Sequence, residues 1–297
     1  MEGLIKLSEN TLGIIQKFIS SKDFIQLYLT SKSIFKETKR LKFIVLKRVD
    51  SFKFYKDYEF RERVLSYIDS RYQLSLDLNN YWEVVVVRKL WGIHTLNLSG
   101  CDNVSDVNFL GDIHTLNLGY CANVSDVSAL GGVYSLKLSG CFKVTDVSAL
   151  GGVHTLNLKN CYNVNDVSAL GGVHTLNLSN SNVSVVSDLG GVHTLNLKYW
   201  NKVLDVSDLG GLHTLNLDSW HNVTNVSALS GLHNLNLSYC FKVTDVSALG
   251  GLHTLNLNGC VKVIDVSALG DLHTLNLHSC IKVTDVSALG GVHTLIL

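Results

Sequence analysis

The chain has 297 residues, seven cysteines, no proline and a formal net charge of zero at pH 7. The zero hides an asymmetry: residues 1–70 carry fourteen Lys or Arg against nine Asp or Glu, and the remainder carries eleven against sixteen. Neither part has the concentrated basic character of a nucleic-acid-binding protein. No apolar run approaches the ~20 residues of a membrane helix, and residues 1–12 do not resemble a secretory signal. We therefore expect an intracellular, cytoplasmic protein with no nucleic-acid or membrane partner.

Residues 1–50 contain no repeat and are predicted to form a small helical domain. One amphipathic helix is indicated by apolar residues at the three-to-four-residue spacing of a single helix face. Residues 23–29 begin a second short helix, and a third follows residues 31–35. The apolar residues of the first helix are Leu12, Ile15, Phe18 and Ile19.

This N-terminal pattern resembles an F-box, a helical hairpin that docks onto a Skp-type adaptor of cullin-based ubiquitin ligases. The resemblance covers roughly residues 4–50, with Ser8 in place of the usual proline and Phe35 where a tryptophan often stands. It implies adaptor binding by Leu7, Leu12, Ile15, Phe18, Ile19, Phe24 and Leu27. The alternative is a helical cap that only shields the end of the array that follows, after a helical linker over residues 51–70.

Residues 71–90 are predicted to form a degenerate capping repeat. A shift of twenty positions aligns Leu76 with Leu96 and puts Tyr81 at the place of a later cysteine. Atypical terminal units of this kind are expected in repeat arrays. At the other end the sequence stops inside a predicted strand, so we expect an uncapped edge that pairs with another chain or marks a truncated product.

From 91 to 297 a unit of about twenty residues occurs ten times and an eleventh begins. In the unit 151–170, Leu156 and Leu158 alternate with polar residues, as in a strand with one buried face. A unit this short cannot bury its apolar face alone, so it must stack on copies of itself. The paired glycines at 171–172 are expected to adopt backbone angles that other residues avoid, at the corner before the next strand.

The pattern V-x-x-L-x-L-x-x-C-x-x-V-x-D-V-x-x-L resembles the leucine-rich repeat in its cysteine-containing form. The resemblance implies an α/β solenoid, a curved leucine-rich-repeat array with a parallel β-sheet on its concave side, preceded by the small helical N-terminal domain. All seven cysteines occupy one repeat position, which predicts packing and not a disulfide framework. The near-identity of the copies resembles repeat arrays of giant DNA viruses, which would place the protein in the host cell cytoplasm.

Equivalent side chains of stacked units should form columns ~4.8 Å apart. A histidine column, interrupted at Tyr134, is interpreted as a structural ladder, because a zinc site needs a closed tetrahedron of ligands. An aspartate column just before each short helical turn is expected to cap backbone N–H groups. No nucleophile stands beside a partnered base, so we expect no enzyme activity, no catalytic residue, no bound metal and no cofactor.

The copies differ mainly in the residues that flank the cysteine, and a variable edge on a constant scaffold is the predicted surface for a protein target. Neutral drift at exposed positions is the alternative. Trp200 and Trp220 stand at the cysteine place of two units, where we expect a local bulge or an outward-turned ring, because an indole is too large for the space of a thiol. The predicted target-binding residues are Tyr120, Phe142, Tyr162, Tyr199, Trp200, Trp220, Tyr239 and Phe241.

Together these patterns favour a protein–protein interaction module. The leading hypothesis is the substrate-recognition subunit of a cullin-type ubiquitin ligase, with the F-box-like segment on a Skp-type adaptor and the repeats on the target. The alternative is an interaction or structural leucine-rich-repeat solenoid with no role in ubiquitin transfer.

Overall fold

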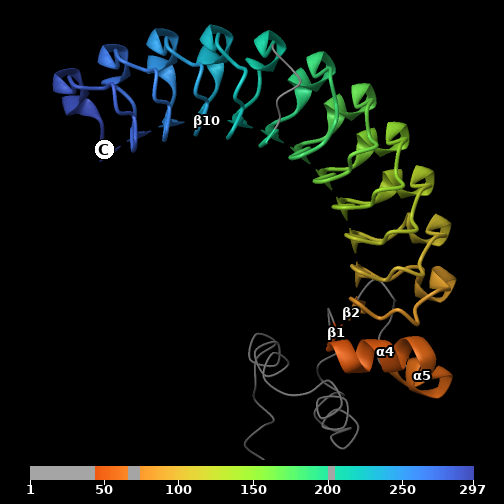
Figure 1. The fold of residues 1–297 in the computed structure, drawn as a ribbon. Helices are drawn as coiled ribbons and strands as arrows, with labels where there is room; N and C mark the ends of the chain where they lie inside the picture. Colours follow the sequence, from red (N-terminus) through yellow and green to blue (C-terminus); the bar gives the residue numbers. More distant parts are fainter. Residues whose placement is uncertain (1–43, 66–73, 200–204) are drawn as a thin grey trace, which may run out of the picture.

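The computed structural model describes residues 44–65, 74–199 and 205–297. Within these ranges the chain is an arc of stacked coils, one coil to each repeat (Figure 1). The strands line the inner, concave side of the arc and short helical turns line the outer side (Figure 1). The N-terminal residues to which the F-box resemblance applies lie almost wholly outside the described residues.

In the described ranges thirteen parallel strands form one sheet, and their spatial order is their order in the chain. Each coil returns in the same direction, so like residues pair with like: Leu156 lies opposite Leu136 on one side and Leu176 on the other. The strands are β1 (Ile44–Leu46), β2 (Leu74–Asp77), β3 (Thr95–Asn97), β4 (Thr115–Asn117), β5 (Ser135–Lys137), β6 (Thr155–Asn157), β7 (Thr175–Asn177), β8 (Thr194–Asn196), β9 (Thr214–Asn216), β10 (Asn234–Asn236), β11 (Thr254–Asn256), β12 (Thr274–Asn276) and β13 (Thr294–Ile296).

From β2 onward, each return path between two strands carries one 3-10 helix, the tight turn that suits a connection of only a few residues. These helices stack on one another along the outer side of the arc (Figure 1). They are η3 (Val87–Leu90), η4 (Asn108–Leu110), η5 (Ser128–Gly132), η6 (Ser148–Gly152), η7 (Ser168–Gly172), η8 (Ser187–Gly191), η9 (Ser207–Leu209), η10 (Ser227–Gly231), η11 (Ser247–Gly251), η12 (Ser267–Leu269) and η13 (Ser287–Gly291).

The core is a continuous stack of apolar columns between the sheet and the 3-10 helices. In the coil 151–170, Leu156, Leu158 and Cys161 are all at most 1% exposed. Thr155 and Asn157 point to the other face of the strand, because side chains alternate along it. The curved solenoid with its parallel sheet on the concave side, expected from the repeat, is confirmed.

The first described coil contains residues at the end of the expected helical domain (1–50) and most of the expected helical linker (51–70). Residues 44–46 form β1, which pairs with β2 as part of the solenoid sheet. Helices α4 (Arg48–Lys56) and α5 (Tyr58–Leu65) take the place that a 3-10 helix has in later coils. Phe54 is fully buried, and the buried Ser51 hydroxyl donates to the carbonyl of Leu46 and accepts from the N–H of Asp77. Residues 51–65 are therefore mostly helical, and these helices pack against the strands of the first coil.

The paired glycines were expected from the sequence to adopt backbone angles that other residues avoid, and this expectation was wrong. Among the described glycines, only those at 92, 100, 140 and 259 have a positive φ, and neither member of the pair 171–172, nor of the equivalent pair 151–152, does. A Cβ atom on Gly151 would lie 2.3 Å from the carbonyl oxygen of Ala169 in the next coil. Glycine is required there because the coils approach closely, not because the backbone is left-handed.

Trp220 corrects a second expectation, since its ring neither bulges nor turns outward. It is 1% exposed, and its indole N–H donates to the carbonyl of Leu197 at 2.6 Å. The thiols make the equivalent contact in other coils, as Cys141 does with the carbonyl of Leu118 at 3.1 Å. The indole therefore replaces the thiol as donor and fills the interior.

None of the helices in the described ranges is both long and apolar enough to cross a membrane.

Candidate interaction surface

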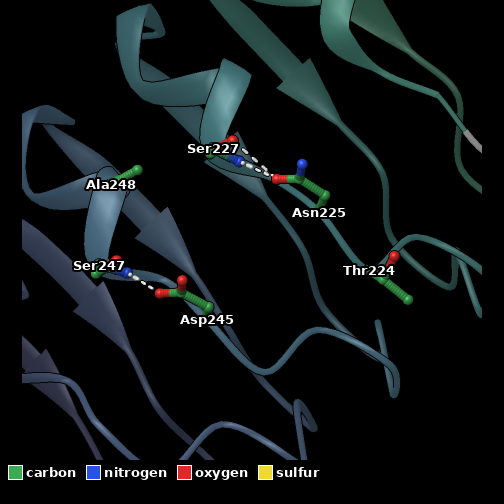
Figure 2. Close-up of a pocket in the computed structure, with 6 residues that line it drawn as sticks. All are labelled: Thr224, Asn225, Ser227, Asp245, Ser247 and Ala248. Atoms are coloured by element: carbon green, nitrogen blue, oxygen red, sulfur yellow. Dashed lines mark hydrogen bonds between the residues drawn. The ribbon is translucent and has the colours of Figure 1, made fainter.

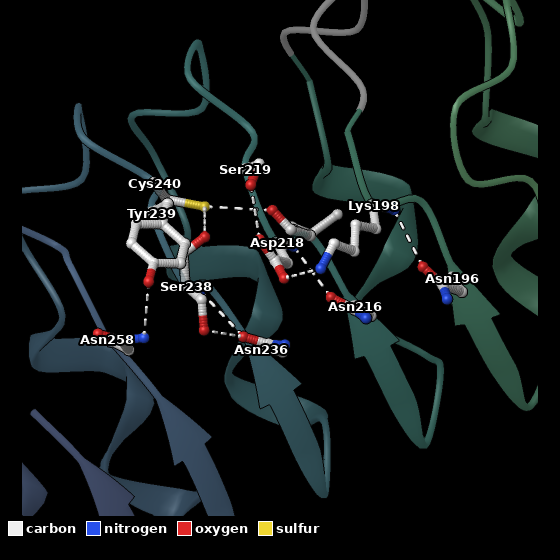
Figure 3. Close-up of polar contacts among 11 residues, drawn as sticks. Asn196, Lys198, Asn216, Asp218, Ser219, Asn236, Ser238, Tyr239, Cys240 and Asn258 are labelled. Carbon is white, nitrogen blue, oxygen red and sulfur yellow. Dashed lines mark hydrogen bonds and ion pairs between the residues drawn. The ribbon is translucent and has the colours of Figure 1, made fainter. Parts of the chain in front are cut away.

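The variable residues lie along the edge of the sheet where the strands end. We define the carboxyl-end rim as the two residues before the cysteine place and the one residue after it in every coil. An asparagine column, interrupted by Lys137, precedes this rim, and its side chains fix the turn. The Asn196 amide oxygen, for example, accepts the backbone N–H of Lys198 at 3.0 Å (Figure 3).

The position just before the cysteine place is left-handed in every described coil, with φ between 56° and 73°. This conformation costs a side chain with a Cβ about 1–2 kcal/mol, and glycine or asparagine adopts it with least strain. Three tyrosines nevertheless occupy it. The occupants in chain order are Asn80, Gly100, Tyr120, Gly140, Asn160, Asn180, Tyr199, Ser219, Tyr239, Gly259 and Ser279.

One group of rim aromatics lies in the coils between residues 111 and 170. The rings of Phe142 and Tyr162 stack with centroids 5.9 Å apart and planes 3° apart. Tyr120 lies against the next coil, where a Cβ on Gly140 would come within 2.6 Å of its ring. These three aromatics are 55%, 44% and 40% exposed in chain order. They therefore present a pre-ordered aromatic surface.

A second group lies further along the arc, around Tyr239 and Phe241. Their rings meet edge to face with centroids 6.2 Å apart, and the ring of His221 stacks on Phe241 at 5.0 Å. The Tyr239 hydroxyl accepts from the Asn258 amide at 3.3 Å (Figure 3). Tyr239 and Phe241 are both exposed.

A polar cluster separates the two aromatic groups. The Lys198 ammonium lies 2.6 Å from the carboxylate of Asp218, which also accepts from the Ser219 hydroxyl (Figure 3). This hydrogen bond to Asp218 raises the pKa of Lys198. The same ammonium lies 4.6 Å from the centre of the Tyr199 ring, within range of a cation–π contact. Tyr199 is thus held in place while its ring remains 57% exposed.

The predicted target-binding residues therefore divide into three groups. Six are exposed on the rim, Trp220 is buried and cannot contact a partner, and Trp200 lies outside the described residues. The predicted adaptor-binding residues also lie outside them. Sequence reasoning missed the left-handed backbone beneath three of the tyrosines. The only signal was that glycine, asparagine and serine alternate with tyrosine at that one position.

A second feature of the surface is the histidine column at the opposite, amino-terminal ends of the strands. Neighbouring rings stack with centroids 4.5–4.7 Å apart, and Tyr134 continues the stack between His114 and His154. In nearly every coil the Nδ1 atom lies 3.0–3.3 Å from the hydroxyl of the next residue, as between His193 and Thr194. The column comprises His94, His114, His154, His174, His193, His213, His233, His253, His273 and His293. The structural ladder expected from the sequence is confirmed.

The stability of the array should fall in mild acid. Desolvation and then the charges of His174 and His213 lower the pKa of His193, and desolvation with the charges of His233 and His273 does the same to His253. Unfolded histidine has a pKa of about 6.5, so this stability is fully present above that pH and is lost as pH falls through the lowered folded values. We expect the melting temperature to drop by several degrees between pH 7.5 and pH 5.5 in a thermal-denaturation series. Tyrosine at alternate column positions, as at 134, should flatten the curve, and an equally flat wild-type curve would contradict the expectation.

The aspartate column caps the 3-10 helices, as predicted. The Asp245 carboxylate accepts the backbone N–H of Ser247 at 2.9 Å, and Asn225 does the same for Ser227 at 3.0 Å (Figure 2). Hydrogen bonds from Ser247 lower the pKa of Asp245. Shallow grooves of about 380 Å³ separate successive caps. Within the described ranges no group of three or more His, Cys, Asp or Glu is placed to hold a metal ion.

The cysteines are free and buried. Burial raises the pKa of Cys101 to about 11 and that of Cys121 to about 12, so neither is a thiolate near neutral pH. Each thiol instead donates to a leucine carbonyl of the preceding coil, as Cys260 does to Leu237 at 3.1 Å. The cysteine column is thus a packing and hydrogen-bonding device.

These features define a curved leucine-rich-repeat solenoid. No protein-family model matches the sequence, and no curated protein does. Among solved structures, the chain is similar to an internalin, InlF, from Listeria monocytogenes, with 21% identity over 71% of this chain and 83% of that one and a TM-score of 0.43. It is also similar to the functional domain of InlJ from Listeria monocytogenes, which includes a cysteine ladder, with 19% identity, 73% and 56% coverage and a TM-score of 0.46. The leucine-rich repeat domain of APL1B shows 13% identity, 74% and 78% coverage and a TM-score of 0.42. At these identities the likeness concerns the fold alone.

Proposed function

We propose that the chain is a protein-interaction module that holds a protein target on its carboxyl-end rim. The observation that carries the proposal is the gathering of seven exposed aromatic side chains on this one edge: the six predicted ones and Trp82, which follows Tyr81 at the cysteine place. Tyrosine and other aromatic residues are favoured anchors at protein interfaces, because they bury large areas with little loss of side-chain freedom.

The backbone beneath three of these aromatics adds a second argument. Tyr120, Tyr199 and Tyr239 occupy a left-handed position that Gly100 and Gly140 fill with less strain. Strained residues that persist where a relaxed alternative exists are concentrated at functional sites. A role in binding accounts for tyrosine there, whereas folding alone favours glycine.

Substitution by the residues that other coils carry tests the proposal without disturbing the core. A rim variant would combine Tyr120→Gly with Phe142→Ala, the residues found at Gly100 and Ala122. We expect it to fold as the wild type does, because both positions are exposed, and to bind the target at least about tenfold more weakly, since anchor residues each contribute on the order of 2 kcal/mol. Proximity labelling in cells would identify the target, and affinity would then be measured with purified proteins.

Phe109→Ala provides the matched control, since Phe109 is 52% exposed but lies in η4 on the outer side of the arc. Targets that depend on the rim should be retained by this control and lost by the rim variant. Equal binding by the wild type, the control and the rim variant would refute the rim as the binding surface.

The N-terminal segment supports a finer candidate function, the substrate-recognition subunit of a cullin-type ubiquitin ligase. Its support is the F-box-like order of apolar residues in the sequence, notably Leu12, Ile15 and Phe18. A pull-down of the full chain with a purified Skp-type adaptor should detect binding that Leu12→Asp abolishes. Binding no stronger than that of the Leu12→Asp variant would leave the solenoid as an interaction module without a ubiquitin role.

A further inference from the structure

The histidine column plays no part in the proposed target binding, because it lies at the other end of every strand from the rim. All of its rings except those of His94 and His154 are exposed. Consecutive rings are nearly parallel, as for His213 and His233, whose centroids are 4.6 Å apart at an angle of 11°. The column is therefore a continuous stack of ionisable side chains, with Tyr134 at one place, on an accessible edge.

Protonation would change this edge from neutral to positive along its whole length. An imidazolium donates from both nitrogens, so the Nδ1–H can remain on the neighbouring threonine hydroxyl while the Nε2–H is left for a ligand. The spacing of 4.5–4.7 Å is shorter than the Debye length of about 8 Å at physiological salt. Each charge therefore acts together with its neighbours and not as an isolated group.

Few charged groups of the described residues lie near enough to neutralise the column. The residue two positions before each histidine is glycine in every coil except two, where it is Asp112 or Asp271. The remaining charges on the elements that pack beside the column are Asp77 in β2, Lys137 in β5, Arg88 and Lys89 in η3, Asp188 in η8 and Asp208 in η9. These five carboxylates are outnumbered by ten imidazolium groups and three fixed cations. The carboxylates of the aspartate column lie at the amino-terminal ends of the 3-10 helices, where they accept backbone N–H groups, whereas the histidines follow the carboxyl-terminal ends.

We infer that the histidine column binds a linear polyanion of phosphate groups without bases, inorganic polyphosphate, in mild acid, where its imidazoles take up protons. A line of closely spaced cations favours a chain of closely spaced anions, and binding is strengthened by the release of condensed counterions. Phosphate oxygens accept from the Nε2–H groups that point away from the threonines. In neutral solution the edge is largely uncharged and has little affinity for polyphosphate.

The stacking of the rings selects against a nucleic acid. Single-stranded nucleic acids bind proteins by stacking their bases on aromatic faces. In the column both faces of each interior ring are covered by its neighbours, as His253 is by His233 and His273. Only ring edges remain available, and edges recognise charge and hydrogen-bond acceptors but not base faces.

Binding and protonation must support each other. A polyanion on the column stabilises the imidazolium form, so binding takes up protons, and the ligand stabilises the folded array where those protons are bound. Polyphosphate should therefore raise the melting temperature at pH 5.5 and leave it unchanged at pH 7.5. This result would be opposite in sign to the acid destabilisation expected without the ligand.

The test is fluorescence anisotropy of labelled inorganic polyphosphate with the full chain at both pH values and constant salt. We expect the affinity at pH 5.5 to exceed that at pH 7.5 by at least about tenfold, and to fall steeply with added salt. A column variant, His174→Tyr with His213→Tyr and His253→Tyr, keeps the stack, because tyrosine already stacks at 134. It should lose most of the acid-dependent gain. The control replaces His221 and His278, which lie outside the column, by tyrosine and should retain that gain.

Three results would overturn the inference: affinity that does not change with pH, equal affinity of the column variant and the control, or tighter binding of an oligothymidylate of equal charge. Isothermal titration in two buffers of different ionisation enthalpy should detect proton uptake at pH 5.5, and its absence would also contradict the inference. Failure here is distinguishable from failure of the proposed function. The rim variant should leave polyphosphate binding unchanged, and the column variant should leave target binding unchanged.

Discussion

Replacing Trp220 by alanine is expected to lower the free energy of unfolding by about 3–5 kcal/mol, the range for removing a buried large aromatic side chain. The indole is 1% exposed and is the largest fully buried side chain of the described core. Its removal leaves a cavity between coils and also leaves the Leu197 carbonyl without the indole donor. Chemical denaturation monitored by circular dichroism would measure the loss.

Trp220→Phe separates these two contributions. Phenylalanine keeps most of the volume but has no N–H, so we expect an intermediate loss of about 1–3 kcal/mol, the cost of an unsatisfied buried carbonyl. Losses from alanine and phenylalanine that are equal, or both near zero, would show that Trp220 does not fill the core as described.

Replacing Gly151 by alanine is expected to destabilise the array by about 1–3 kcal/mol, the usual range for overpacking. The added Cβ would lie 2.3 Å from the Ala169 carbonyl oxygen, and a backbone atom can give way only if two coils separate. Ser230 stands at the equivalent place in one coil, so the array does accommodate a side chain at one joint. Thermal denaturation of the variant would show the loss as a lower melting temperature.

Gly290→Ala is the matched control, because Gly290 holds the same repeat position and nothing lies within 4 Å of the place that an added Cβ would take. Its melting temperature should equal that of the wild type. A loss for Gly290→Ala as large as that for Gly151→Ala would mean that the effect comes from the residue's conformational freedom and not from contact between coils.

Periodicity made the fold predictable. Once Leu156 and Leu158 are assigned to a strand, the near-exact repeat places every equivalent leucine in the same column, and the stacked imidazoles and the aspartate caps follow. The twenty-residue shift likewise predicts that Leu76 lies opposite Leu96, as it does. A repeat thus allows one local assignment to be tested many times within one chain.

Two kinds of feature could not be predicted: those in which a single coil departs from the repeat pattern, and those that depend on how closely neighbouring coils pack. The burial of Trp220 depends on the volume left by its neighbours, which no single-residue rule supplies. The reason for the glycine pair depends on the distance between neighbouring coils, which the sequence does not give. Strand β1 lies in a segment without the repeat, so no pattern predicted it. On the rim, the exposure of the aromatic residues could be predicted from their position in the repeat. The left-handed backbone of Tyr120 could not be predicted from the sequence.

The positions of the cysteines allow local opening of the array to be measured. Four thiols lie in the coils from Cys101 to Cys161 and three from Cys240 to Cys280, and the coils between them have none. Because each thiol is covered by adjacent coils, a thiol-specific reagent reaches it only when that part of the solenoid opens. Labelling rates, resolved by peptide mass, would therefore distinguish breathing of the two halves of the arc without any added probe.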